Sequence, residues 1–525
     1  MQKRMLIMTL VVFAFFLAYE FLVLKPQQEA KLKEQATQTQ SVANNNQAPV
    51  QDVQAPVGTS TTSANMQAPS FNTIAPKNIV SVIKTNKSIY EIDTLGRIAQ
   101  VTLQESKYIN EDGNQIKLFD VNQLRPLEVR FSDANLNDEA FKVQVVANQE
   151  QVDATQEKQV LILTQTLSAT TVTKTVTFYP DGHYDVTVNT STPQSFFMTT
   201  GFRPNVLADM YADHGALLKL NDGTLTTLLD GDMDKTVNLT GVKFASAFDR
   251  YYTSVLYNFE TSMAVSIMKD ANNDPQMFVH GNTNLTLSGY AGPKEFVLLK
   301  SLNPELTDVI EYGWFTFIAK PMFTFLQFIQ SYVGNWGWTI VILTIIIKLI
   351  LYPLSYKGMV SMQKLKELAP KIKELQTKHK DDKQKQSAAM MELYKKHGAN
   401  PMGGCLPLVL QIPVFFAIYR VLLNAIELKG AEWILWIHDL AEMDPYFVLP
   451  ILMGASMYLQ QKLTPNTLQD EMQKKIFQFL PVVFTFFFLW FPAGLTLYWF
   501  INNVFTIAQQ YYINTLFEKQ KATKK

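Results

Sequence analysis

Cysteine is almost absent from this chain of 525 residues, and histidine is scarce. The single Cys405 excludes an internal disulfide and any cysteine-rich metal cluster. The six histidines lack the i, i+4 or short-loop spacing that metal ligands require. A G-x-x-x-x-G-K-S/T phosphate loop is also missing. We therefore expect no metal, no cofactor and no nucleotide as a source of energy.

Catalytic motifs and net charge are likewise missing. The 46 acidic and 46 basic residues cancel, so charge as a whole indicates no partner. The sequence contains no G-x-S-x-G, no H-E-x-x-H and no histidine–aspartate pairing, which argues against an intramembrane enzyme. It also shows no internal repeats or matched broken helices, which secondary transporters usually have. Hydrolysis of a peptide or ester would favour an intramembrane enzyme, and uptake of a small solute would favour a secondary transporter.

Hydrophobic residues make up 47% of the chain, but they are unevenly distributed. Residues before about 305 are polar and strand-like, and later residues are rich in Phe, Leu and Ile. Long apolar runs are typical of membrane-spanning helices. The sequence therefore predicts an α-helical polytopic membrane protein with a large soluble domain.

The apolar run over residues 338–354 carries a lysine near its middle. About twenty apolar residues cross the hydrocarbon of a bilayer, so Lys348 is expected near mid-depth. A cation at that depth is costly and marks a functional site by default. The alternative is a lysine whose stem snorkels to the interface or whose amine pairs structurally.

Two segments precede the soluble domain. Residues 1–24 combine a basic start with an apolar run and no clear A-x-A cleavage site. This pattern favours a retained membrane anchor with a cytoplasmic N-terminus over a cleaved signal peptide. Residues 25–77 are rich in Gln, Asn, Ala, Ser, Thr and Pro. Such a segment cannot bury enough apolar surface to offset chain entropy, which predicts a disordered tether.

Residues 78–302 show a hydrophobic period of two. β-Branched residues alternate over 171–179, a Pro-Asp-Gly turn follows at 180–182, and a second alternating run covers 184–189. This pattern predicts a β-hairpin within a large all-β domain of two packed sheets. We find no nucleophile, phosphate-loop or metal motif in the domain.

Two further segments have amphipathic character. Residues 303–335 are apolar and aromatic but interrupted by charges, which favours a segment lying in the membrane surface over an ordinary helix under the β domain. In residues 357–400 the apolar positions Leu365, Leu368, Ile372 and Leu375 have helical spacing, which predicts an antiparallel helical hairpin in water. This hairpin holds eleven lysines against five acidic residues.

The remaining apolar runs complete a six-span topology. Besides 1–24 and the run with Lys348, the expected spans are residues 406–426, 446–459, 476–491 and 495–511. The loop 427–444 is acidic, whereas the hairpin and the tail at 516–525 are basic. The positive-inside rule then places both termini and the hairpin in the cytoplasm and the β domain outside.

Several short motifs in the membrane part resemble the YidC/Oxa family of membrane protein insertases, in the long form of Gram-negative bacteria. The similarity covers residues 338–512 closely and the anchor, tether and β domain more loosely. The motifs are Tyr352-Pro-Leu354, Asn400-Pro-Met-Gly-Gly-Cys405-Leu-Pro407, Gln411-Ile-Pro413, Trp436-Ile-His-Asp-Leu440, Asp444-Pro-Tyr446, Leu449-Pro-Ile-Leu-Met-Gly454 and Phe491-Pro-Ala-Gly494-Leu-Thr-Leu-Tyr498-Trp499.

This resemblance implies a five-helix insertase core over residues 336–515. The core would enclose a hydrophilic groove, open to the cytoplasm and lipid and closed on the outer side. It also implies a periplasmic β-sandwich similar to sugar-mutarotase folds, with no established catalytic role. Where the family commonly has a groove arginine, this chain has Lys348, which keeps the charge but loses the planar fork needed for bidentate binding.

The expected function is therefore that of a bacterial inner-membrane insertase and chaperone, not an enzyme. The expected partners are nascent membrane proteins, the phospholipid bilayer, the Sec translocon, and ribosome or signal-recognition components. Around the central cation we expect polar residues from several spans, each with an alternative role in interhelical hydrogen bonding or packing. The candidate groove residues are Lys348, Thr344, Gln411, Trp499 and Asn502, with Asn503 beside them.

Overall fold

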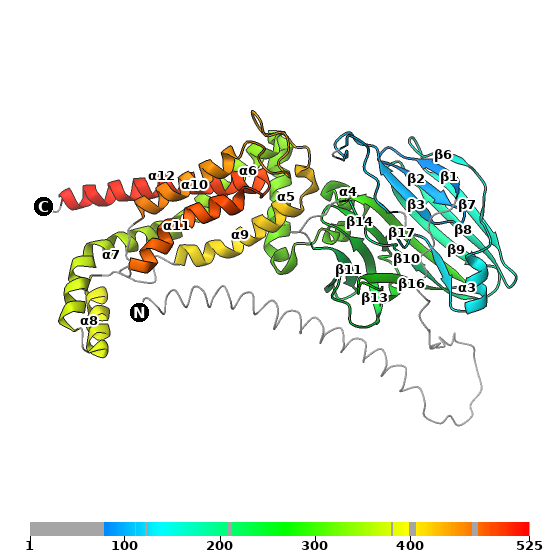
Figure 1. The fold of residues 1–525 in the computed structure, drawn as a ribbon, viewed down its shortest axis with the longest axis horizontal. Coiled ribbons are helices and arrows are strands. Elements are labelled where there is room, and N and C mark those ends of the chain that lie inside the picture. Colours follow the sequence, from blue (N-terminus) through cyan, green and yellow to red (C-terminus); the bar gives the residue numbers. More distant parts are fainter. Residues whose placement is uncertain are drawn as a thin grey trace, which may run out of the picture. The chain divides into compact units, whose positions relative to one another are not determined.

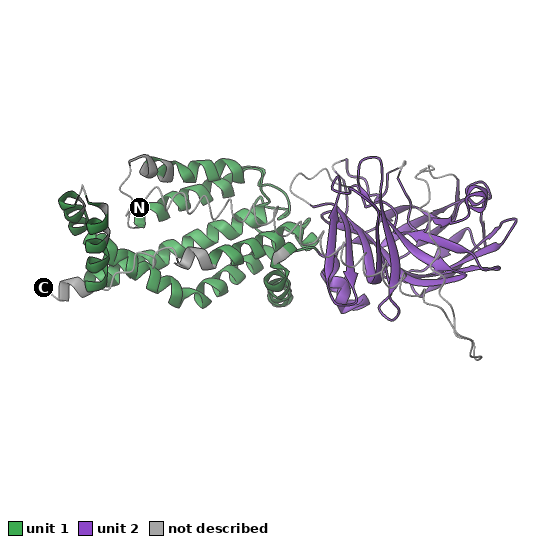
Figure 2. Cartoon of the chain, turned by 90° about the horizontal axis from the view of Figure 1, so that it is seen from below, with its two compact units in different colours: residues 1–11, 311–525 green, residues 12–310 purple. Residues whose placement is uncertain are grey.

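The computed structural model describes residues 78–110, 112–120, 123–206, 213–379, 382–397, 406–464 and 471–523. The predicted anchor and tether, residues 1–24 and 25–77, lie outside these ranges. The described chain divides into two compact units at residues 310 and 311 (Figures 1 and 2). We call residues 78–310 the β unit and residues 311–523 the helical unit, and describe each by itself.

The described residues of the β unit form two sheets. A four-stranded sheet has the order β3-β2-β1-β6, and the large sheet follows the path β4-β10-β16-β15-β13-β14-β17-β9-β8-β7-β5, with β11 and β12 paired to its side. The strands are β1 (Ile79–Lys84), β2 (Ser88–Asp93), β3 (Ile98–Leu103), β4 (Val129–Phe131), β5 (Val146–Ala147), β6 (Gln151–Asp153), β7 (Gln159–Thr166), β8 (Thr171–Phe178), β9 (His183–Thr190), β10 (Ser195–Thr199), β11 (Gly215–Leu220), β12 (Leu225–Leu229), β13 (Val237–Phe248), β14 (Tyr252–Tyr257), β15 (Met263–Lys269), β16 (Pro275–Asn282) and β17 (Asn284–Pro293). The short helices are α3 (Ala134–Ala140), α4 (Phe296–Leu302) and η2 (Pro304–Val309).

Aromatic side chains fill the space between the two sheets. Tyr90 of β2 packs against Phe178 of β8, with ring centroids 5.2 Å apart, and its hydroxyl donates to Gly182 O at 2.6 Å. Gly182 adopts φ +90° in the turn between β8 and β9, a conformation that glycine allows without steric cost. β8 and β9 pair antiparallel along their lengths, so the predicted hairpin is confirmed.

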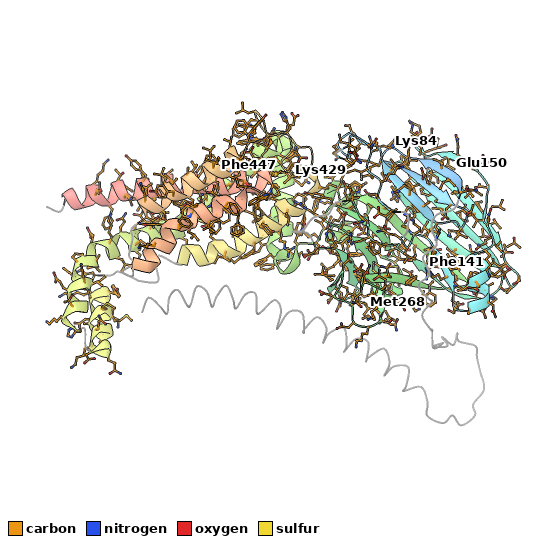
Figure 3. The ribbon with its side chains drawn as sticks, viewed as in Figure 1. Lys84, Phe141, Glu150, Met268, Lys429 and Phe447 are labelled. Carbon is orange, nitrogen blue, oxygen red and sulfur yellow. The ribbon has the colours of Figure 1, made fainter. Side chains whose placement is uncertain are left out.

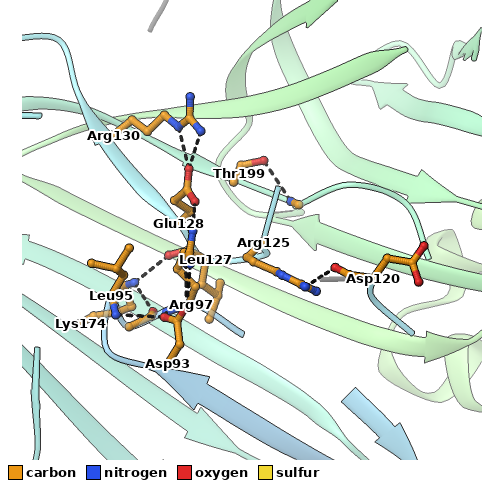
Figure 4. Close-up of polar contacts among 12 residues, drawn as sticks. Asp93, Leu95, Arg97, Asp120, Arg125, Leu127, Glu128, Arg130, Lys174 and Thr199 are labelled. Carbon is orange, nitrogen blue, oxygen red and sulfur yellow. Dashed lines mark hydrogen bonds and ion pairs between the residues drawn. The ribbon is translucent and has the colours of Figure 1, made fainter. Parts of the chain in front are cut away.

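A fully buried network of charges crosses the β unit (Figure 4). Arg97 donates to Asp93 Oδ2 at 2.9 Å and to Glu128 Oε2 at 2.7 Å, and Arg130 donates to Glu128 Oε1 at 2.7 Å. None of the four side chains is more than 2% exposed. Glu128 therefore compensates two buried guanidinium groups at once.

Lys174 extends this network through backbone carbonyls. Its Nζ donates to Gly96 O at 2.6 Å and to Leu127 O at 2.7 Å. Leu127 adopts φ +63°, a costly conformation for leucine that aligns its carbonyl with the amine (Figure 4). Burial lowers the pKa of Lys174 to about 8, below that of an exposed lysine. Between about pH 8 and the ordinary lysine pKa of 10.5 the unfolded chain therefore binds more protons than the folded chain, so the cost of burying this lysine falls as pH rises through that range.

Replacing Glu128 with glutamine should destabilise the β unit strongly. The substitution keeps the side-chain volume but leaves two buried arginines without their shared carboxylate. Breaking a buried ion pair costs about 3–5 kcal/mol. Hydrogen exchange of the full-length protein, read at β2 and β4, measures the change. The matched control is Asp138→Asn, where the side chain is 77% exposed and we expect less than about 1 kcal/mol. Parental protection in E128Q would contradict a stabilising role for the network.

The described residues of the helical unit form ten helical segments. Its elements are η3 (Gly313–Phe315), α5 (Thr316–Val333), α6 (Trp336–Ile350), α7 (Tyr352–Lys378), α8 (Lys383–Lys396), α9 (Leu406–Asn424), η4 (Ile426–Leu428), α10 (Val448–Leu463), α11 (Glu471–Phe488) and α12 (Ala493–Thr523). α12 packs against α6, α7, α9 and α10, so it is the central helix of the unit.

None of the helices in the described ranges is, taken singly, both long and apolar enough to cross a membrane. α6 and residues Tyr352–Leu375 of α7 meet that requirement together, but they bend by 63° at the break between them. The six spans expected from the sequence therefore stay a prediction.

The hairpin of α7 and α8 has an apolar seam. Leu365, Leu368 and Ile372 of α7 are buried together with Met390 of α8. Three of the four positions predicted from helical spacing thus form the contact between the two helices.

α5 has one buried and one exposed face. Phe323, Leu326 and Ile329 are buried, whereas Phe317, Phe328 and Tyr332 are between 56% and 77% exposed. An exposed aromatic face of this kind is typical of helices that lie in a membrane surface. The interfacial location of this segment stays a prediction.

Candidate functional site

Lys348 lies in the last turn of α6 and is buried within the helical unit. Only 6% of its surface is exposed, and its Nζ donates to Thr506 Oγ1 of α12 at 2.9 Å. Among the described residues, no carboxylate forms an ion pair with this amine. The cation is therefore held by a neutral hydroxyl. Its charge stays uncompensated by the part of the chain that the structure describes.

A chain of hydrogen bonds continues from Lys348 along α12. The Thr506 hydroxyl donates to Asn502 O at 2.7 Å, one turn earlier on the same helix. Gln411 of α9 donates from Nε2 to Asn502 Oδ1 at 2.8 Å. We call Lys348, Thr506, Asn502 and Gln411 the polar seam. It joins α6, α9 and α12 with one cation, one hydroxyl and two amides.

The structure thus brings together three predicted site residues, Lys348, Gln411 and Asn502. Thr344 is buried one turn before Lys348, but its hydroxyl donates to Ile340 O of its own helix at 2.7 Å. Asn503 faces away from the seam and donates to Ser456 Oγ of α10 at 3.2 Å. Whether any of these residues binds a substrate stays a prediction.

Trp499 lies one turn before Asn502 but belongs to an aromatic cluster. Its ring is 4.6 Å from that of Phe415 on α9, 5.2 Å from Phe488 and 5.8 Å from Phe484 on α11. Phe415 is itself one turn after Gln411. An apolar aromatic wall therefore borders the polar seam on both α9 and α12.

Thr506 was missed in the sequence, although a signal for it exists. It follows Asn502 by four residues, so both lie on the same face of a helix. Threonine is common in helices and its hydroxyl often bonds its own backbone, as this one does. Only the packing of α6 against α12 shows that Thr506 also accepts from the lysine.

The loop between η4 and α10 is tied to the start of α6. Lys429 directly follows η4 and Phe447 directly precedes α10 (Figure 3). Within the loop, the buried Asp444 accepts from Trp436 Nε1 at 2.9 Å and from Leu449 N at 2.7 Å. Asn335 Nδ2 donates to the backbone oxygen of Glu432 at 3.0 Å. The loop is therefore anchored to the N-terminal ends of α6 and α10.

The arrangement offers hydrogen bonding and a positive charge. Within the described ranges, no group of three or more His, Cys, Asp or Glu residues could hold a metal ion. The seam can donate and accept hydrogen bonds and can attract an anionic group. Such properties suit recognition of a polar chain segment.

Two family models match the sequence. The model described as "60Kd inner membrane protein" matches residues 328–521, which include the polar seam. The model described as "YidC periplasmic domain" matches residues 214–325.

Full-length relatives carry the name "Membrane protein insertase YidC". The relative from Campylobacter jejuni subsp. jejuni serotype O:2 is 49% identical over 523 residues, covering 99% of this chain and 97% of its own. The relative from Wolinella succinogenes is 50% identical over 523 residues, with coverage of 99% and 96%. The relative from Helicobacter pylori (strain ATCC 700392 / 26695) is 44% identical over 546 residues, with coverage of 99% and 97%.

Solved structures are more distant. The active YidC insertase with its first transmembrane domain resolved is 19% identical, with a TM-score of 0.36, and the match covers 84% of this chain and 95% of that one. YidC from Thermotoga maritima is 15% identical, with a TM-score of 0.28 and coverage of 82% and 99%. Identity near 50% over almost the whole length of this chain and of its relatives shows that the chain belongs to the YidC family of inner membrane proteins.

Proposed function

We propose that this protein is a membrane protein insertase and chaperone that helps nascent proteins enter and fold in the inner membrane. A hydrophilic groove around Lys348 would receive the polar segment of the substrate, without nucleotide hydrolysis. The observation that carries the proposal is the buried amine of Lys348, which has a hydroxyl partner and no carboxylate among the described residues. The name of the full-length relatives supports it.

The chemistry of the polar seam fits this task. A polar segment that enters hydrocarbon loses its hydrogen bonds to water, at a cost of several kcal/mol for each unsatisfied group. The amides of Gln411 and Asn502 and the hydroxyl of Thr506 can replace some of those bonds. The amine of Lys348 can attract an acidic group of the substrate. The bordering aromatic wall offers an apolar surface to the substrate's membrane-spanning helix.

Reconstitution tests the function directly. The full-length protein is placed in lipid vesicles and supplied with a small single-span substrate that has an acidic translocated tail. Protease protection of the tail measures insertion. We expect protection well above that of protein-free vesicles, with no dependence on added nucleotide. Protection equal to that of protein-free vesicles would refute the proposal.

We further propose six spans, with both termini and the hairpin in the cytoplasm and the β unit in the periplasm. Two cysteine variants test this topology in a Cys405→Ala background. Asp138→Cys lies in the β unit and Lys385→Cys in the hairpin, and the parent side chains are 77% and 76% exposed. Because their exposure matches, a difference in labelling reports the compartment. An impermeant maleimide should label D138C in intact spheroplasts and K385C only after permeabilisation; the opposite order would overturn the topology.

The hairpin is our proposed contact for ribosome or signal-recognition components, and the Sec translocon is a proposed partner in the membrane. Eleven lysines of residues 357–400 suit binding to RNA phosphates. Replacing Lys395 and Lys396 with glutamine should weaken co-sedimentation with ribosomes. It should also reduce the salt dependence: the slope of the logarithm of the binding constant against the logarithm of the salt concentration should become shallower by about one unit for each phosphate that is no longer bound. Glutamine at Lys142 and Lys158 of the β unit is the control. Ribosome binding that changes neither with salt nor with either pair of glutamine substitutions would exclude a role of the hairpin lysines in ribosome binding.

A further inference from the structure

Lys348 lies next to the bend between α6 and α7. α6 ends at Ile350, two residues after Lys348, and α7 begins at Tyr352. The two helices meet at 63°. A change in that angle would move the end of α6, and with it the amine. The position of Lys348 therefore depends on how α7 is held.

α12 bonds to both sides of the bend. Before the bend, Thr506 accepts from Lys348. After the bend, Asn514 accepts from Gln363 of α7. Thr506 and Asn514 are eight residues apart, about 12 Å along one helix. The single helix α12 is thus bonded to α6 on one side of the break and to α7 on the other.

Three amides make the second attachment. Gln363 Nε2 and Gln510 Nε2 both donate to the same atom, Asn514 Oδ1, the latter at 2.7 Å. The side chains of Gln363 and Gln510 are 7% and 4% exposed. A buried donor without its acceptor costs about 1–3 kcal/mol, so this attachment resists opening. We call these three residues the amide clasp.

We infer that the amide clasp is a positioning device for Lys348. By holding α7 on α12, Gln363, Gln510 and Asn514 set the α6–α7 bend and keep the amine in the polar seam. This inference rests on the proposed function of Lys348. The clasp itself does not touch the amine. It acts on substrates only through the placement of that charge.

Two substitutions at Asn514 separate acceptor chemistry from packing. Asn514→Leu keeps a similar volume but removes the shared acceptor, whereas Asn514→Asp retains an oxygen in its place. With the full-length protein in vesicles, N514L should lower insertion of an acidic-tail substrate about fivefold per molecule, and N514D should retain most insertion. An uncharged-tail substrate, which does not need the cation, should be affected less.

A double-mutant cycle shows whether the clasp acts through the lysine. If it does, N514L should have little further effect in a Lys348→Ala background. Multiplicative losses in the double mutant, or equal losses for both substrates, would overturn the inference. Spin labels at Ile350→Cys of α6 and Val504→Cys of α12, in the Cys405→Ala background, give an independent readout, since the parent side chains are 71% and 40% exposed. N514L should broaden the distance distribution between them, and an unchanged distribution would also overturn the inference.

Failure of the proposed function would look different. If Lys348→Ala alone leaves insertion of the acidic-tail substrate unchanged, the role assigned to the cation is wrong, whatever N514L does. If K348A impairs insertion while N514L changes neither insertion nor the label distance, only the clasp is refuted.

Discussion

Replacing Lys348 with alanine should lower insertion of substrates with acidic translocated tails about tenfold or more. This magnitude follows from the interaction that alanine removes, since hydrogen bonds to charged groups contribute about 1.5–3 kcal/mol and about 1.4 kcal/mol corresponds to a factor of ten. Lys348→Arg should retain most activity, because either cation attracts an acidic tail. Lys348→Glu should be worse than alanine, because it replaces attraction with repulsion.

A matched control separates charge from the local hydrogen bond. Thr506→Val removes the hydroxyl that accepts from the lysine but leaves the cation in place. We expect this variant to lose less insertion of acidic-tail substrates than Lys348→Ala, because the charge remains although the amine has lost its hydroxyl partner. Protein abundance in the membrane and insertion per molecule are measured for all five proteins. A lysine that only stabilises the fold would lower abundance in the alanine and glutamate variants and leave insertion per molecule equal across the series.

The members of the seam could be predicted in part because their residue types are unusual in apolar helices. Lys348, Gln411 and Asn502 each interrupt a hydrophobic run, and burying a polar group requires a partner. Which partner it finds depends on helix rotation and packing, which hydropathy does not report. Asn502 and Asn503 are adjacent in sequence, yet one faces α9 and the other α10.

The β unit shows the same division between local and long-range information. The hairpin of β8 and β9 was predictable because the alternation and the turn are adjacent in sequence. The pairing of Arg97 with Glu128 joins residues 31 positions apart, and Lys174 bonds a carbonyl 47 positions away. No periodicity encodes such pairings. They follow from the stacking of two sheets, and an isolated arginine or lysine in a strand reads as a surface residue.

A second large effect is expected where the loop between η4 and α10 meets α6. Gly337, in the first turn of α6, lies directly under the side chain of Trp433. A Cβ atom added at Gly337 would come within 2.2 Å of Trp433 Cγ and 2.6 Å of its Cβ. Because atoms at the root of the indole are involved, rotating the ring cannot relieve the overlap. Glycine is therefore needed here for close packing and not for a special backbone conformation.

Gly337→Val should destabilise the helical unit by about 1–3 kcal/mol, the usual cost of overpacking. The thermal unfolding temperature of the full-length protein in detergent measures this loss. Trp433→Ala should also destabilise, because it leaves a cavity beside α6. The double variant is the decisive measurement: valine fills part of the space that the indole vacates, so G337V/W433A should be more stable than the sum of the two single changes. Additive losses would mean that the two residues do not touch, and the loop would then not be anchored to the start of α6 through Trp433.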